Sequence, residues 1–175
     1  MGIHDYTFYD LINRNAVCFN DRQAWFEAED QRITTFAEIK EQVDRLASGL
    51  QKLGVLKGDR ICAVGKNTLE FFLLYGSAAA LGAIVVPINW RLSVEEAHFN
   101  LNDVEPRILF VDPDFQEMME VGPKEKFSSV EHHFNLKPSG GNLAEFASLM
   151  DNAGEFDAVD VASDDGLVII HTAAV

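Results

Sequence analysis

The sequence predicts an α/β fold in which helices flank a largely parallel sheet, and three observations support this class. The middle of the chain alternates between stretches with apolar residues at helical spacing and short stretches that are apolar throughout. Strands that are apolar on both faces are typical of parallel sheets covered by helices, joined by right-handed crossovers. The helical stretches also begin with N-cap residues, which places each helix between two strands.

The first thirty or so residues precede this alternation. Residues Asp10–Phe19 predict a short helix. The runs Ala24–Glu27 and Arg32–Thr34 flank the polar residues Glu-Asp-Gln, so they predict a β-hairpin.

The first long helix is expected to begin at a capping box formed by Thr35 and Glu38. In such a box a hydroxyl and a carboxylate bind backbone N–H groups that have no partner within the helix. Apolar residues then recur at helical spacing, at Phe36, Ile39, Val43, Leu46, Leu50 and Leu53. Gly54 is expected just past the end of this helix, and Gly54 and Gly58 permit the turn into a buried strand at Arg60–Gly65.

A second helix is expected to open at Asn67 and Glu70 and to end near Leu81, with Gly82 beyond it. Ala83–Ile88 then predicts a strand. Because proline has no N–H to donate, Pro87 marks either the end of this strand or a position at the edge of the sheet.

A further capping box, formed by Ser93 and Glu96, predicts a third helix that ends near Asn102. Arg107–Asp112 predicts the strand that follows. The carboxylates of Glu95 and Glu96 are explained by the first turn of this helix, where negative charge is favoured.

The pattern weakens after Pro113 and becomes clear again at Leu167–Ile170, which predicts a buried strand. The chain then stops at Val175 without a polar tail. Because globular domains rarely end directly after a central strand, we expect the sequence to be incomplete.

Composition excludes several classes of protein. The 175 residues carry a formal net charge of −14, which opposes binding to nucleic acid. A hydrophobic content of 47% supplies a core and disfavours disorder. The longest apolar stretch, Phe71–Ile88, contains two glycines and a proline and predicts two packed elements, not a transmembrane segment. No secretory signal is expected from the acidic N-terminal residues, and Cys18 and Cys62 in apolar surroundings predict buried free thiols and a cytoplasmic protein.

Motifs for common chemistries are absent from the sequence. It contains no Gly-x-Ser-x-Gly nucleophile elbow, no Walker loop and no complete Gly-x-Gly-x-x-Gly. His132 and His133 are expected to be a solvated loop pair, because adjacent side chains point in different directions and no third ligand has suitable spacing. We therefore expect neither a metal site nor a catalytic residue within this chain.

Four stretches, in order, resemble the N-terminal part of the adenylate-forming enzymes, the superfamily that includes acyl-CoA synthetases, beetle luciferases and nonribosomal-peptide adenylation domains. The first two, Ile33–Leu53 and Gly54–Leu74, resemble the family's opening helix and its G-(V/I)-x-x-G-D-R-V motif. Ala80–Asp103 is similar to a stretch that includes P-(L/I)-N-x-R-L. Asp164–Thr172 (DDGLVIIHT) resembles the approach to the phosphate loop.

This resemblance implies that residues 1–175 are the N-terminal portion of an AMP-binding domain, truncated at the start of the phosphate loop. The parent would be an AMP-forming acyl-CoA synthetase that uses ATP, Mg²⁺ and CoA, with a fatty or aromatic carboxylic acid as substrate. No cofactor is expected to bind the fragment itself, which we expect to be inactive. We also expect it to expose apolar surface and to form a homodimer or aggregate.

The resemblance places part of a phosphate-binding loop at the end of the chain. Thr172 matches the first Thr of the family's Thr-Ser-Gly-Thr-Thr-Gly-x-Pro-Lys loop. Ala173, Ala174 and Val175 stand where the family has Ser, Gly and Thr. The family's catalytic lysine and Mg²⁺ carboxylate would lie beyond Val175.

Two residues after the strand Ala83–Ile88 have alternative roles. Arg91 is expected to pair with Asp103 or another carboxylate, and contact with substrate is the alternative. Trp90 is expected to be a packed surface aromatic residue, and the alternative is that it lines an acyl or CoA channel.

Other functions remain open at this point. Within the same superfamily, the parent could be a luciferase-like enzyme or could load a carrier protein. From a different class, a non-catalytic, doubly wound signalling module resembling a receiver domain would use Asp112, at the end of a strand, as phospho-acceptor. A receiver also needs an acidic pair after its first strand, whereas Asp164 and Asp165 precede the last strand.

Overall fold

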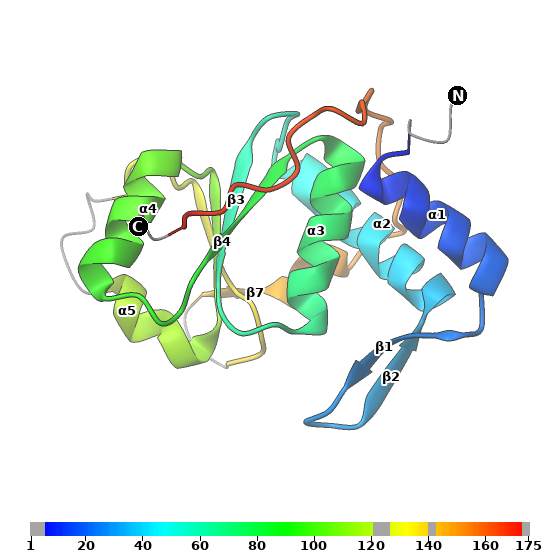
Figure 1. Ribbon diagram of the computed structural model, residues 1–175, viewed down its shortest axis with the longest axis horizontal. Coiled ribbons are helices and arrows are strands. Elements are labelled where there is room, and N and C mark those ends of the chain that lie inside the picture. The colour runs from blue at the N-terminus through cyan, green and yellow to red at the C-terminus, as the bar shows by residue number, and fades with distance from the viewer. Residues whose placement is uncertain (1–5, 121–126, 140–142, 173–175) are drawn as a thin grey trace.

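A five-stranded parallel sheet runs through the molecule, with helices on both of its faces (Figure 1). The computed structural model describes residues 6–120, 127–139 and 143–172. The α-helices are α1 (Phe8–Phe19), α2 (Phe36–Lys52), α3 (Leu69–Leu81), α4 (Val94–Val104) and α5 (Gln116–Glu120), and the 3₁₀ turns are η1 (Pro113–Phe115) and η3 (Phe146–Met150). The strands are β1 (Gln23–Glu27), β2 (Arg32–Thr35), β3 (Arg60–Val64), β4 (Ile84–Ile88), β5 (Ile108–Val111), β6 (His132–Asn135) and β7 (Ala144–Glu145).

The strand order β4-β3-β5-β6-β7 confirms the predicted parallel sheet. The chain enters at β3, adds β4 on one side, and then crosses back to build β5, β6 and β7 on the other side. Such a reversal of direction is a topological switch point, and ligands of open α/β sheets bind outside the carboxyl ends of the strands there. The switch lies between β3 and β5.

Alternate residues of each central strand pack into two separate cores. Ile61 and Ala63 of β3 join the larger core, beneath α2 and α3, with α1 and η3 contributing further side chains. Cys62 and Val64 face the other way, into a smaller core closed by α4 and α5. Because both faces are buried, each central strand is apolar throughout, which is why its sequence pattern predicted a parallel sheet.

The predicted capping boxes begin α2 and α4. The Thr35 N–H donates to Glu38 Oε2 (2.7 Å), and the Glu38 N–H donates to Thr35 Oγ1 (3.2 Å). Ser93 and Glu96 make the same pair of bonds at α4. Bonds from the capping residue's backbone N–H and its hydroxyl lower the pKa values of both glutamates, so these carboxylates stay ionised in their structural role.

The first helix, the hairpin and the helix ends agree with the predictions from the sequence, with shifts of a few residues. Helix α3 is capped by Thr68, whose Oγ1 accepts the Phe71 N–H, so the expected start at Asn67 and Glu70 was wrong by one residue. Helix α4 extends to Val104, beyond the expected end near Asn102, because Glu105 takes the left-handed conformation that closes it. Gly82 closes α3 as predicted, with φ of 66°.

The expected buried strand at Leu167–Ile170 was wrong in extent. This segment runs parallel to β4 but makes only one bridge, between Val168 and Val85. The Val85 N–H donates to the Leu167 carbonyl (2.9 Å), and Val85 accepts from the Ile169 N–H (3.1 Å). The next N atom facing outward belongs to Pro87, which has no hydrogen, so the ladder stops and Ile170 is 67% exposed. Pro87 is thus on the outer side of the edge strand β4 in this five-stranded sheet.

The region after Pro113 contains elements that the sequence did not predict. His132 and His133 lie in strand β6, paired with Ile108 and Leu109 of β5, so the expectation of a solvated loop was wrong. Only Phe134 and Asn135 of this strand are buried, which leaves too short an apolar run to recognise.

The two cysteines differ in environment. Cys62 is buried as predicted, and burial raises the pKa of its thiol well above the usual range. Cys18 is exposed, contrary to expectation, because it lies on the outer side of α1. Both are free thiols. None of the described helices is long and apolar enough to cross a bilayer.

Candidate functional site

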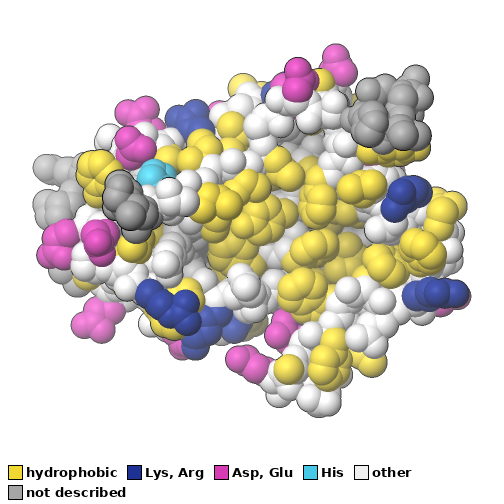
Figure 2. All heavy atoms as spheres, in the orientation of Figure 1, with side chains coloured by type: hydrophobic (Ala, Val, Ile, Leu, Met, Phe, Trp, Pro, Cys, Tyr) yellow, Lys and Arg dark blue, Asp and Glu magenta, His cyan; other side chains and the backbone are white. Residues whose placement is uncertain are grey.

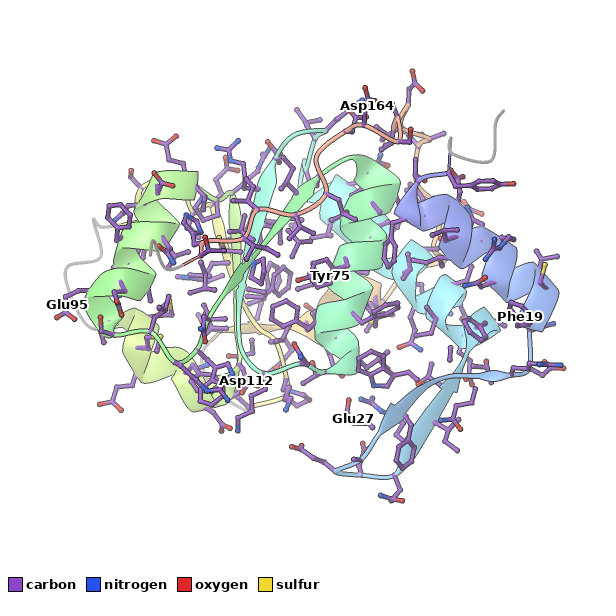
Figure 3. The ribbon with its side chains drawn as sticks, viewed as in Figure 1. Phe19, Glu27, Tyr75, Glu95, Asp112 and Asp164 are labelled. Carbon is purple, nitrogen blue, oxygen red and sulfur yellow. The ribbon has the colours of Figure 1, made fainter. Side chains whose placement is uncertain are left out.

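The carboxyl ends of β3, β4 and β5 form the edge of the sheet where a ligand is expected. Gly65 follows β3, Asn89 follows β4 and Asp112 follows β5. A Cβ atom on Gly65 would lie 3.0 Å from the Cβ of Asp112, so glycine allows these two strand ends to approach closely. Figure 3 shows Asp112 at this edge and Asp164 at the opposite end of the sheet.

An aromatic and cationic cluster lies at this edge. The rings of Trp90 and Phe115 pack with centroids 5.5 Å apart, which confirms Trp90 as a packed aromatic residue. The guanidinium of Arg91 lies 4.3 Å from the centroid of the Trp90 ring, and the Lys66 ammonium lies 5.8 Å from it. Residues that follow β3, β4 and β5 therefore meet in one cluster.

The expected ion pair between Arg91 and Asp103 was wrong. Arg91 forms no ion pair with any residue that the structure describes, because its guanidinium stacks on Trp90 instead. Asp103 pairs with His171, whose Nε2 lies 3.2 Å from Asp103 Oδ2. The pair joins the segment beside β4 to helix α4.

A groove of about 390 Å³ lies between α4 and the end of the segment beside β4. We call it the α4 groove; its lining includes Pro87, Asn89, Glu95, Phe99, His171 and Thr172. The ring of Phe99 is 68% exposed here, and Glu95 lies at the start of α4 (Figure 3). Helix α4 thus lines the groove with both apolar and acidic side chains.

His171 and Thr172 lie at the mouth of the α4 groove. Nδ1 of His171 is buried and has no hydrogen-bond partner in the described part of the chain. Thr172 is exposed. The remaining residues expected in the phosphate loop, Ala173, Ala174 and Val175, lie outside the described residues.

Asp112 is buried behind the switch point, with 3% of its side chain exposed. Its Oδ1 accepts the Asp114 N–H, and Lys137 Nζ lies 3.7 Å from its Oδ2. Gly65 and Lys66 follow β3, where a receiver domain would need an acidic pair. Among residues 6–120, 127–139 and 143–172, no three His, Cys, Asp or Glu side chains are grouped so that they could hold a metal ion.

Comparisons with known proteins agree with this geometry. A family model described as "AMP-binding enzyme" matches residues 12–173. A long-chain-fatty-acid–CoA ligase of Thermus thermophilus is 31% identical over 114 residues, which are 64% of this chain and 21% of that protein. A 2-succinylbenzoate–CoA ligase of Bacillus cereus is 32% identical over 141 residues, 75% of this chain and 28% of that protein.

Solved structures show the same fold. One solved structure is described as a long-chain-fatty-acid CoA ligase from Rhodopseudomonas palustris. It superposes with a TM-score of 0.89 at 34% identity, covering 98% of this chain and 43% of that one. A fatty acyl CoA synthetase of Mycobacterium tuberculosis gives a TM-score of 0.85 at 26% identity, covering 95% and 32%. The chain therefore spans between a fifth and somewhat over a quarter of the curated relatives quoted above. Because the family model matches residues 12–173, which are most of the chain, the chain belongs to the AMP-binding enzyme family.

Proposed function

We propose that residues 1–175 are the N-terminal part of an AMP-forming acyl-CoA synthetase, which joins a carboxylic acid to CoA while ATP is converted to AMP and pyrophosphate. One observation carries the proposal. The segment from Leu167 to Thr172 runs parallel to β4 and brings Thr172 to the carboxyl edge of the sheet, beside the α4 groove. Nucleotides bind at that edge in open α/β sheets.

In this proposal Thr172 begins the phosphate-binding loop, and its exposed hydroxyl donates to an ATP phosphate. Ala173, Ala174 and Val175 continue the loop through their backbone N–H groups, because they lack the hydroxyls of the usual family loop. ATP supplies the adenylyl group that activates the acid. The Mg²⁺ ligands would come from the rest of the parent, since the described residues offer no group of three ligands.

Lys66 and Arg91 support a role in binding a phosphate-bearing ligand such as ATP or CoA. Both cations lie over the Trp90 ring at the carboxyl edge, in a chain whose formal net charge is −14. Lys66 Nζ also lies 3.9 Å from Asp114 Oδ2, whereas Arg91 forms no ion pair with the described residues, so Arg91 is the cation best able to attract an anion here.

The names of the relatives favour a fatty or aromatic acid as substrate and CoA as acceptor. One relative from Streptomyces coeruleorubidus, 30% identical over 92 residues, is named as a fatty acid–[acyl-carrier-protein] ligase, so a carrier protein is the second candidate acceptor. Thioester formation by the parent, measured with CoA and with a carrier protein in separate reactions, distinguishes the two. A luciferase-like enzyme from Zophobas morio shares the fold at 22% identity.

The receiver-like alternative has no support. Its acidic pair is missing after β3, its phospho-acceptor Asp112 is buried, and residues 12–173 match the AMP-binding model. We further propose that the parent is cytoplasmic and that residues 1–175, expressed alone, associate as a homodimer through apolar surface.

Acid-dependent exchange between ATP and pyrophosphate tests the proposed function. The full-length parent should exchange with at least one member of a panel of fatty and aromatic acids. Residues 1–175 alone should show no exchange, because the groups that stabilise charge on the α-phosphate would lie beyond Val175. Exchange by the fragment, or silence of the parent with every acid, would contradict the proposal.

A further inference from the structure

Residues 151–166 form an extended strap that crosses from η3 to the start of the segment beside β4 (Figure 1). Side chains of α2 hold its first half. Ser48 Oγ donates to the Glu155 carbonyl (2.7 Å), and the Gln51 side chain both donates to and accepts from the backbone of Asp157 (3.0 and 2.7 Å). The strap therefore depends on side-chain contacts for its position, since no helix or strand forms within it.

Lys57 holds the second half of the strap. Its Nζ lies 2.6 Å from Asp165 Oδ2 and donates to the Asp160 carbonyl at 2.9 Å. Asp165 Oδ2 also accepts the Ala162 N–H (2.7 Å), so one carboxylate closes the turn and binds Lys57. The ammonium of Lys57, in the turn before β3, thus binds the strap at two points, Asp160 and Asp165.

The stem of Lys57 is itself held in place. It lies against Gly82, where a Cβ atom would be 2.8 Å from Lys57 Cγ and 3.2 Å from Val161 Cγ2. Gly82 has a φ of 66°, and its carbonyl accepts the Gly58 N–H (2.8 Å). The corner between α3 and β4, the Lys57 side chain and the strap therefore pack against one another at the amino end of the sheet.

The segment that follows is weakly fixed by its backbone alone. Val85 supplies both of its hydrogen bonds to β4, and Pro87 prevents a further one. Two bonds leave a parallel segment free to slip by two residues, which would keep the same side chains on each face. Apart from the packing of Ile169 against the smaller core, the register must be fixed by contacts outside the ladder.

We propose that Lys57 is a positioning residue: by binding Asp165 it fixes the register of residues 167–172 on β4, and hence the place of Thr172 at the carboxyl edge. His171, paired with Asp103, fixes the other end. The expected effect on ATP binding rests on the proposed function, whereas the fixing of the register by Lys57 does not. In the full-length parent, Lys57→Met should raise KM for ATP several-fold, leave KM for the acid unchanged, and be rescued by Lys57→Arg.

Amide hydrogen exchange on residues 1–175 tests the positioning role separately from any activity. In Lys57→Met the Val85 and Ile169 amides should exchange at least tenfold faster, whereas the Asp112 amide, bonded to the Val64 carbonyl in the sheet interior, should keep its rate. Lys52→Met is the matched control, because Lys52 at the end of α2 forms no ion pair with the described residues.

Each result has a defined meaning. Unchanged exchange at Ile169 would overturn the proposal, and so would equal acceleration at Asp112, which would show a role in global stability instead. If exchange at Ile169 accelerates but the parent shows no ATP–pyrophosphate exchange, Lys57 positions the segment and the proposed function is wrong.

Discussion

At Gly49 the helix α2 packs tightly against η3. A Cβ atom there would lie 2.1 Å from the Leu149 carbonyl oxygen, and the atoms that would have to move are backbone. No side chain fits at this position without separating the two elements. The glycine therefore brings η3, and with it the start of the strap, against α2.

Gly49→Ala should lower the free energy of unfolding by about 1–3 kcal/mol, the usual cost of overpacking a closed contact. The urea midpoint measures it. Gly166→Ala is the control for adding a methyl group, because its Cβ atom would meet only the Ile84 side chain, at ordinary contact distances of 3.4 and 3.8 Å. Equal midpoints for the Gly49→Ala variant and the unmodified chain would mean that α2 and η3 do not pack as described.

The caps of the helices decide where these elements begin. Thr35→Ala removes the acceptor for the Glu38 N–H and should destabilise the chain by about 0.5–2 kcal/mol. Thr35→Ser keeps the hydroxyl and should restore most of the loss in chemical denaturation. A Thr35→Ala midpoint equal to that of the unmodified chain would place the start of α2 elsewhere.

The strap should respond to acid. The Lys57 side chain, and then the Ala162 N–H, lower the pKa of Asp165 below its ordinary value. A lowered folded-state pKa gives stability that is present above the ordinary pKa of Asp, near 4, and lost as pH falls through the lower folded value. The protection factor of the Ile169 amide, which compares its exchange with that of an unprotected amide at the same pH, should therefore fall below about pH 4, and Asp165→Asn should abolish this fall. A pH dependence that persists in Asp165→Asn would assign it to another group.

Elements with a complete local pattern could be predicted from the sequence. Helices α2 and α4 have caps and helical spacing, and β3 to β5 are apolar on both faces. Strand β6 could not be predicted because only half of it is buried. The extent of the segment beside β4 depends on a proline in another strand, which no local pattern reports. The same limit applies to the site: the Asp103–His171 pair joins residues 68 positions apart.

The molecule as a whole presents apolar surface on one face. Figure 2 shows hydrophobic side chains gathered over β4, α3 and the neighbouring segment, and Ile170 is 67% exposed. Soluble monomers rarely expose large contiguous apolar patches. We propose that the rest of the parent covers that face.

Residues 1–175 alone should bind a hydrophobic dye and associate with increasing concentration. Ile170→Lys should reduce both effects more than Leu56→Lys, which changes a residue of similar exposure (66%) at the turn before β3. Sedimentation and dye fluorescence measure the two effects. A monodisperse monomer that binds no dye would contradict the proposed covering of this face.

In the proposed function, the segment beside β4 brings Thr172 to the phosphates of ATP. Thr172→Val in the full-length parent removes the hydroxyl and keeps the shape of the side chain. Because a hydrogen bond to a charged group contributes about 1.5–3 kcal/mol, KM for ATP in the exchange reaction should rise by roughly tenfold to a hundredfold. Thr172→Ser should keep it close to the value of the unmodified parent. An unchanged KM for ATP in Thr172→Val would contradict the placement of Thr172 at the phosphates.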